Sequence, residues 1–165
     1  MFRNDLVFIL DVDGVITDGK MWYNKDGKYL KAFGCDDFDL LREIQKYMKV
    51  VFITADKKGY PIVKKRIVDE MGWRLEIVPS FPKERWDWIK NNFLQYNVIF
   101  MADGVFDFLA LSKCYYGITT KDALTHVRNE ASLVVERSGG HRAVAEACLK
   151  IMDMVGVDWR KEYVE

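Results

Sequence analysis

Two carboxylates stand directly behind an apolar run near the N-terminus. Residues 6–10, Leu-Val-Phe-Ile-Leu, run without interruption into Asp11, and Asp13 follows one residue later. A continuous apolar run of this length is typical of a strand buried on both faces of a parallel sheet. Charge is costly in such a core, and ligands of open α/β sheets bind beyond the carboxyl ends of the strands. The pair is therefore a candidate for chemistry at a strand end, although Asp-x-Asp-Gly is also an ordinary turn sequence.

Other polar residues could meet this pair in one crevice, because they follow further predicted strands or open a helix: Thr54, Lys83, Asp103 and Asp107. Taken alone, Thr54 suits a strand, Lys83 a solvated helix start, and Asp103 a turn. Together they suit phosphoryl transfer, in which a carboxylate attacks phosphorus and water later cleaves the covalent intermediate. Two anions must approach each other in this reaction, so it requires Mg²⁺, for which carboxylates from two strand ends are suitable ligands.

The motifs around these residues resemble those of the haloacid dehalogenase superfamily. The resemblance is greatest to the small capless branch of 3-deoxy-manno-octulosonate 8-phosphate and nonulosonate 9-phosphate phosphatases. It includes residues 11–19, Asp-Val-Asp-Gly-Val-Ile-Thr-Asp-Gly, and residues 139–146, which are similar to the branch's Gly-Gly-x-Gly-Ala-Val-x-Glu segment. It extends from Phe8 to about Met152, and implies an Mg²⁺-dependent phosphatase of a small phosphorylated metabolite such as a sugar or sugar-acid phosphate.

The resemblance also implies a role for each matching catalytic residue. Asp11 would be the nucleophile and a metal ligand, forming an aspartyl-phosphate. Asp13 would be the general acid and base, with its backbone carbonyl on the metal. Thr54 would bind the phosphoryl oxygens, and Lys83 would neutralise charge on the phosphoryl group and the nucleophile.

Metal and substrate contacts follow from the same comparison. The implied metal ligands are Asp11, Asp13, Asp103 and Asp107. Asp107 would either bind the metal directly or lie next to a residue that does. The implied substrate-binding residues are Gly14, Thr54, Ala55, Asp56, Lys83, His141 and Arg142. In the branch four subunits associate and a neighbour's C-terminal segment helps to close each site, so a homotetramer is expected. His141 and Arg142 could equally be solvated side chains at the start of a helix.

Two motifs depart from the pattern of the branch. The second motif is Thr-Ala-Asp at 54–56, where the branch has Thr-Gly-Arg or Thr-Gly-Glu. The fourth is Ala-Asp-Gly at 102–104, where the branch has Gly-Asp-Asp. An alternative hypothesis is therefore a catalytically weak or inactive binding or assembly module that keeps the fold.

The elements that must position these residues alternate along the chain. Apolar runs predict strands at 6–11, 50–53, 75–78, 98–101, 114–118 and 133–135. Periodicity and caps predict helices from Asp36 or Asp37 to 48, then at 57–71, 82–94, 105–113 and 121–129, and a last one ending near 154. This order predicts a right-handed, Rossmann-like doubly wound parallel sheet over one domain, residues 1–165, without a cap domain. Asp26-Gly27 between aromatic-rich segments predicts a β-hairpin flap after the first strand.

Composition narrows the function classes. The chain of 165 residues has 25 Lys plus Arg and 25 Asp plus Glu, so no basic excess points to nucleic acid. No apolar run approaches a membrane span and no signal-peptide pattern begins the chain, which predicts a cytoplasmic protein. The three cysteines have no metal-type spacing and are expected to be free thiols.

Overall fold

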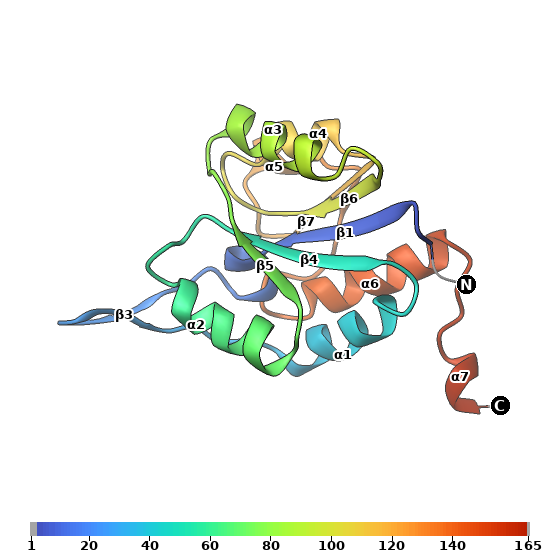
Figure 1. Ribbon diagram of the computed structural model, residues 1–165, viewed down its shortest axis with the longest axis horizontal. Coiled ribbons are helices and arrows are strands. Elements are labelled where there is room, and N and C mark those ends of the chain that lie inside the picture. The colour runs from blue at the N-terminus through green and yellow to red at the C-terminus, as the bar shows by residue number, and fades with distance from the viewer. Residues whose placement is uncertain (1–2, 165) are drawn as a thin grey trace.

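A six-stranded parallel sheet forms the centre of the computed structural model, which describes residues 3–164 (Figure 1). Strand β1 (Leu6–Asp11) lies in the middle, between β4 (Lys49–Thr54) and β6 (Asn97–Met101). The order across the sheet is β5-β4-β1-β6-β7-β8, in which the outer strands are β5 (Arg74–Ile77), β7 (Tyr116–Thr119) and β8 (Leu133–Val134). All neighbouring pairs run parallel, so their carboxyl ends share one edge.

Every residue of β1 is buried, because helices cover both faces of the sheet. Phe8 and Leu10 point into one core, whereas Val7 and Ile9 point into the other. Side chains alternate between the two faces of a strand, so a strand covered on both sides must be apolar throughout. This explains why the run before Asp11 contains no polar residue.

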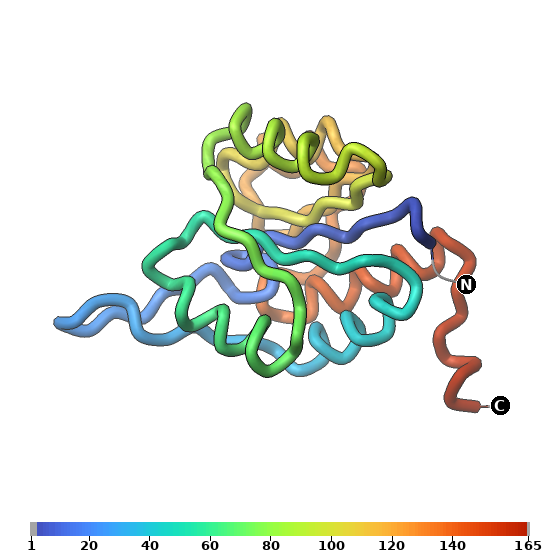
Figure 2. The backbone as a smooth tube through the Cα atoms, in the orientation of Figure 1, coloured from blue at the N-terminus to red at the C-terminus, as the bar shows by residue number. Residues whose placement is uncertain are grey.

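The helices lie in two layers, one on each face of the sheet (Figure 1). One layer holds α1 (Cys35–Ile44), α2 (Tyr60–Lys64) with its irregular continuation η2 (Lys65–Glu70), and α6 (Ala143–Met154). The other holds α3 (Pro82–Asn92), α4 (Phe108–Lys113) and α5 (Thr125–Arg128). A short helix, α7 (Lys161–Val164), follows near the C-terminus, as the backbone trace also shows (Figure 2).

A two-stranded antiparallel hairpin, β2 (Trp22–Asn24) and β3 (Gly27–Leu30), extends from the body of the molecule (Figure 2). Gly27 has φ +121°, a conformation that side chains disfavour. The hairpin projects from the end of the molecule at which β1 reaches its carboxyl end (Figure 1). The predicted flap is therefore present and lies beside the strand ends.

The predicted α/β class, parallel sheet and hairpin are confirmed, and no cap domain interrupts the described residues 3–164. Within the same range no helix has the length and apolar character that a bilayer crossing requires. All three cysteines are free, as predicted.

The prediction that Asp36 or Asp37 caps α1 is wrong. The helix begins at Cys35 after Gly34, and it ends at Ile44 rather than near residue 48. The Asp37 carboxylate instead accepts the Ala145 backbone N–H at 2.8 Å, in the first turn of α6. Asp37 is thus a cap supplied from another helix, since the first backbone N–H groups of α6 have no partner within their own helix.

Candidate active site

Asp11 ends β1, and the chain turns sharply behind it through η1 (Val12–Ile16). The Asp11 carboxylate accepts the Val12 N–H at 3.0 Å. Gly14 has φ +80°, and a Cβ built there would lie 2.0 Å from Oδ2 of Asp103. Only glycine therefore lets this loop approach the end of β6 so closely.

Residues from three strand ends line a cavity of about 430 Å³ at this edge of the sheet. Its lining residues are Asp11, Asp13, Gly19, Met21, Thr54, Ala55, Asp56, Arg85, Asp103 and Gly104. Thr54 ends β4, next to β1, and Asp103 follows β6 on the other side of β1. The parallel arrangement thus brings together six of the predicted site residues, because all three strands end at the same edge.

The cation at this site is Arg85 rather than the predicted Lys83. Lys83 is exposed and does not line the cavity, whereas Arg85 is only 4% exposed. Nη1 of Arg85 lies 3.5 Å from Oδ2 of Asp11 and donates a short hydrogen bond to Asp107. Its Nε donates to the Pro79 carbonyl at 2.9 Å, which fixes the guanidinium between the two carboxylates. The prediction for Lys83 fails because the first turn of α3 directs residue 85, not residue 83, toward the sheet.

The carboxylates of the site carry more negative charge than Arg85 neutralises. Burial raises the pKa of Asp11 to about 7, the Arg85 guanidinium opposes this rise, and the Asp107 and Asp13 carboxylates add to it. Burial, with the charges of Asp11 and Asp107, also raises the pKa of Asp103 to about 8. A cation bound beside these two carboxyl groups would stabilise their ionised forms.

The fit of the side chains to Mg²⁺ depends on which oxygens are free. Oδ1 of Asp103 is buried and has no hydrogen-bond partner. Asp107 is engaged by Arg85 and by the Gly104 N–H, and Asp13 is engaged by Lys31. Within residues 3–164 no three Asp, Glu, His or Cys side chains form a metal-binding cluster.

Of the four aspartates implied as metal ligands, two keep carboxylates available to a metal, Asp107 takes the second of the two places expected for it, and the backbone-carbonyl role of Asp13 stays a prediction. Asp11 and Asp103 remain as carboxylates that could bind a metal, and Asp107 lies behind them as the partner of Arg85. This pair still fits Mg²⁺, which prefers oxygen ligands and keeps several waters when few protein ligands are available.

A second group of charges joins the hairpin to the site. Nζ of Lys31 lies 2.6 Å and 2.8 Å from the two oxygens of Asp13, and 2.8 Å from Oδ2 of Asp56. Lys28 also donates to Asp56. The hairpin is thus held to the ends of β1 and β4 by ion pairs.

His141 and Arg142 do not line the aspartate cavity of their own chain. They line a separate cavity of about 440 Å³ together with Cys35, Asp36 and Arg137, among others. The preceding loop nevertheless packs against η1, where the Gly140 N–H donates to the Val15 carbonyl at 3.0 Å. The contribution of these two residues to a neighbouring subunit's site stays a prediction.

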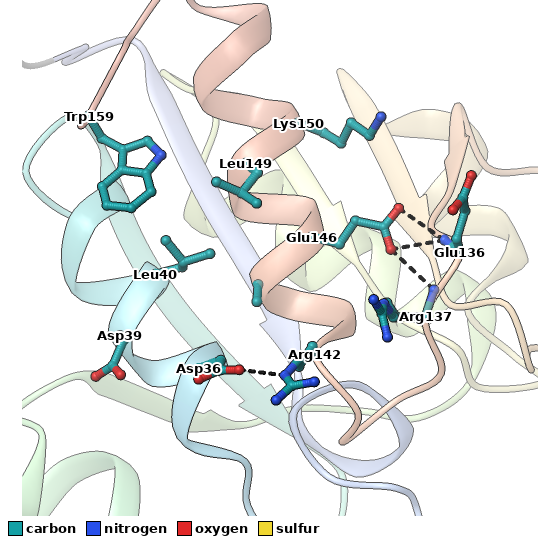
Figure 3. A pocket seen from close by; sticks show the side chains of 11 residues that line it. Asp36, Asp39, Leu40, Glu136, Arg137, Arg142, Glu146, Leu149, Lys150 and Trp159 are labelled. Carbon is teal, nitrogen blue, oxygen red and sulfur yellow. Dashed lines mark hydrogen bonds and ion pairs between the residues drawn. The ribbon is translucent and has the colours of Figure 1, made fainter. Parts of the chain in front are cut away.

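Another cavity, of about 610 Å³, lies between α1 and α6, and neither Asp11 nor Asp103 lines it (Figure 3). Arg142 points across it and pairs with Asp36, and Glu146 accepts the backbone N–H groups of Glu136 and Arg137 (Figure 3). Arg142 has φ +70° although it is not glycine. Arg142 matches the third glycine of the Gly-Gly-x-Gly-Ala-Val-x-Glu segment with which residues 139–146 are compared. This chain therefore has a strained residue where that segment has a glycine.

Three cations of the site were not predicted: Lys28, Lys31 and Arg85. A sequence signal existed for Arg85, because it precedes the buried Ile89 by four residues and so shares its helix face. Lys28 and Lys31 have no such signal, since the partners of both lie on other segments of the chain.

The chain has a relative among known phosphatases over most of its length. No protein-family model matches it. It is 27% identical over 151 residues to the 3-deoxy-D-manno-octulosonate 8-phosphate phosphatase KdsC of Haemophilus influenzae. The matched region covers 90% of this chain and 83% of that protein.

Solved structures show the same fold. One is the 3-deoxy-D-manno-octulosonate 8-phosphate phosphatase of Moraxella catarrhalis in complex with a magnesium ion, a phosphate ion and a KDO molecule. It has a TM-score of 0.79 and 22% identity, covering 91% of this chain and 86% of that one. Another is a subfamily III A hydrolase of the haloacid dehalogenase superfamily from Legionella pneumophila, with a TM-score of 0.79 and 24% identity, covering 89% and 81%. The predicted resemblance to haloacid dehalogenase phosphatases of the octulosonate-phosphate type is confirmed.

Proposed function

We propose that this chain is an Mg²⁺-dependent phosphoric monoester hydrolase that acts on a small sugar-acid phosphate, with Asp11 as nucleophile. The observation that carries the proposal is the convergence of Asp11 and Asp103 from two strand ends on one cavity, with Arg85 beside them. The sequence similarity to an octulosonate 8-phosphate phosphatase supports this substrate class.

The reaction proposed for these residues has two steps. In the first, an Asp11 oxygen bonds to phosphorus while the bond to the ester oxygen breaks, and Asp13 gives that oxygen its proton. In the second, Asp13 takes a proton from a water molecule, which attacks phosphorus and releases Asp11 and inorganic phosphate.

Arg85 and Thr54 prepare the site for the phosphoryl group. The Arg85 guanidinium keeps Asp11 in place and offsets part of the charge that accumulates as the two anions meet. The Thr54 hydroxyl accepts the Asp56 N–H at 3.0 Å, which leaves its own proton free for a phosphoryl oxygen. When bound between Asp11 and Asp103, Mg²⁺ would supply further positive charge to the phosphoryl oxygens.

A direct test is the hydrolysis of 4-nitrophenyl phosphate with and without Mg²⁺. We expect turnover that requires Mg²⁺ and is lost in Asp11→Asn, since the amide is a poor nucleophile. Asp69→Asn is the matched control, because Asp69 is an exposed aspartate on η2 whose one ion-pair partner among residues 3–164 is Lys64. Turnover that survives Asp11→Asn would contradict the nucleophile assignment.

The alternative is a non-catalytic module on the same fold, which the altered second motif favours. Asp56 of this motif is held by lysines of the hairpin, where the capless branch has Arg or Glu. This alternative predicts no turnover on a panel of sugar and sugar-acid phosphates. Capture of beryllofluoride in the presence of Mg²⁺ separates the two, because it requires the nucleophile and the metal site together. A homotetramer with shared sites stays a prediction of the resemblance.

A further inference from the structure

Lys31 is a buried lysine at the base of an exposed hairpin. Its side chain is 0% exposed, although Leu30 before it is 48% exposed. A lysine is rarely buried unless its charge is paired. Here all of the pairing goes to the site, to both oxygens of Asp13 and to Oδ2 of Asp56.

Asp56 is itself held in place from several directions. Lys28 and Lys31 donate to its Oδ2, and the Gly59 N–H donates to Oδ1 at 3.0 Å. Burial raises the pKa of Asp56, but the hydrogen bonds from the two lysines outweigh it and lower the pKa to about 2. Asp56 is therefore a fixed anion that anchors Lys31 beside Asp13.

The position of Asp13 makes this anchor necessary. Asp13 lies in η1 with φ −76° and ψ 125°, so no regular helix holds its side chain. Its side chain is 20% exposed at the edge of the cavity. A group that transfers a proton must hold its oxygen within hydrogen-bond reach of the reacting atom, and misplacement of about 1 Å can cost two orders of magnitude in rate.

We propose that Lys31 is a positioning residue for Asp13, that its contact with both carboxyl oxygens sets their direction toward the leaving group, and that Asp56 holds Lys31 for this task. The inference rests on the proposed function. It also gives the unusual Asp of the second motif a purpose in this chain, since an Arg there would repel Lys31.

The test compares two substrates that differ in their need for a proton. Nitrophenolate leaves readily without one, whereas the alkoxide of a sugar-acid phosphate does not. In Lys31→Met we expect kcat/KM for 3-deoxy-D-manno-octulosonate 8-phosphate, which reports the step that releases the leaving group, to fall by about 100-fold, the lower range of general acid catalysis. We expect a much smaller fall in kcat/KM for 4-nitrophenyl phosphate, because its leaving group needs no proton and the later water attack does not enter kcat/KM.

Two further variants separate positioning from a general structural effect. Lys31→Arg keeps a cation that can contact both oxygens, so the ratio of the two kcat/KM values should return toward that of the parent. Lys25→Met removes an exposed lysine of the same hairpin that has no ion pair among residues 3–164, so it should leave the ratio near the parent value.

An equal loss of kcat/KM for both esters in Lys31→Met, or no loss for either, would overturn the proposal. If the parent chain hydrolyses neither ester, the proposed function itself fails, and the inference fails with it. Thermal unfolding of each variant shows whether the hairpin and the sheet remain folded, and Lys31→Arg supplies the comparison if Lys31→Met is unstable.

Discussion

Replacement of Arg85 by Met is expected to cost both stability and activity, whereas Lys83→Met should cost almost nothing. Arg85 is buried between Asp11 and Asp107, and its side chain is 5% exposed. Without it, two buried carboxylates would lose their only cationic partner among residues 3–164. Lys83 is exposed and has no ion pair within the same described range.

The magnitude follows from the burial of these groups. Removal of one partner of a buried ion pair typically costs about 3–5 kcal/mol, because the other charge is left unpaired. Asp11 lines a cavity open to water and can protonate near neutral pH, so we expect about 3 kcal/mol for Arg85→Met at pH 7. A surface substitution such as Lys83→Met should stay within about 0.5 kcal/mol.

Urea unfolding of the metal-free proteins measures these differences, with the slope checked for a change in the unfolded state. The double variant Arg85→Met with Asp107→Asn should recover part of the loss, because one of the unpaired carboxylates is then neutral. Hydrolysis of 4-nitrophenyl phosphate should fall in Arg85→Met and stay near the parent level in Lys83→Met.

An exchange of effects between the two variants would contradict the role given to Arg85. Loss of turnover in Lys83→Met with a stable, active Arg85→Met would return the role to the lysine that the sequence motif indicates. Arg85→Lys is also informative: a lysine cannot reproduce the planar contact with two carboxylates and Pro79, so it should restore stability only in part.

Three more predictions concern the same region. Burial raises the folded-state pKa values of Asp11 and Asp103 to about 7 and about 8, so as far as these groups decide, the metal-free protein should be most stable below pH 4 to 5. It should lose stability as the pH rises above that range and through 7 to 8, by roughly 1.4 kcal/mol per unit of difference between the folded and unfolded pKa values. Urea unfolding measures this dependence, which Mg²⁺ should flatten. Gly14→Ala should abolish turnover and destabilise the fold, since the new Cβ would meet Asp103 at 2.0 Å, and circular dichroism with a turnover assay checks both effects. Arg142→Gly should raise stability by up to about 1 kcal/mol, because relief of φ +70° outweighs an exposed ion pair with Asp36, and a lower melting temperature would contradict this.

Local patterns were sufficient to predict much of the fold. The apolar run before Asp11, the Asp26-Gly27 turn and the alternation of strand and helix each depend on neighbours in the sequence, and each is present in the structure. The convergence of Asp11, Thr54 and Asp103 was predictable as well. It follows from the parallel direction of their strands rather than from any detail of packing.

Only the tertiary structure decided which charges meet at the site. Arg85 and Asp11 are 74 residues apart, and Lys31 lies 25 residues from Asp56. Such pairs depend on how a helix face or a hairpin base is turned toward the sheet, and one position along a helix changes that direction by about 100°. The motif therefore indicated that a cation would stand beside the nucleophile, while the packing of α3 determined that it is Arg85 and not Lys83.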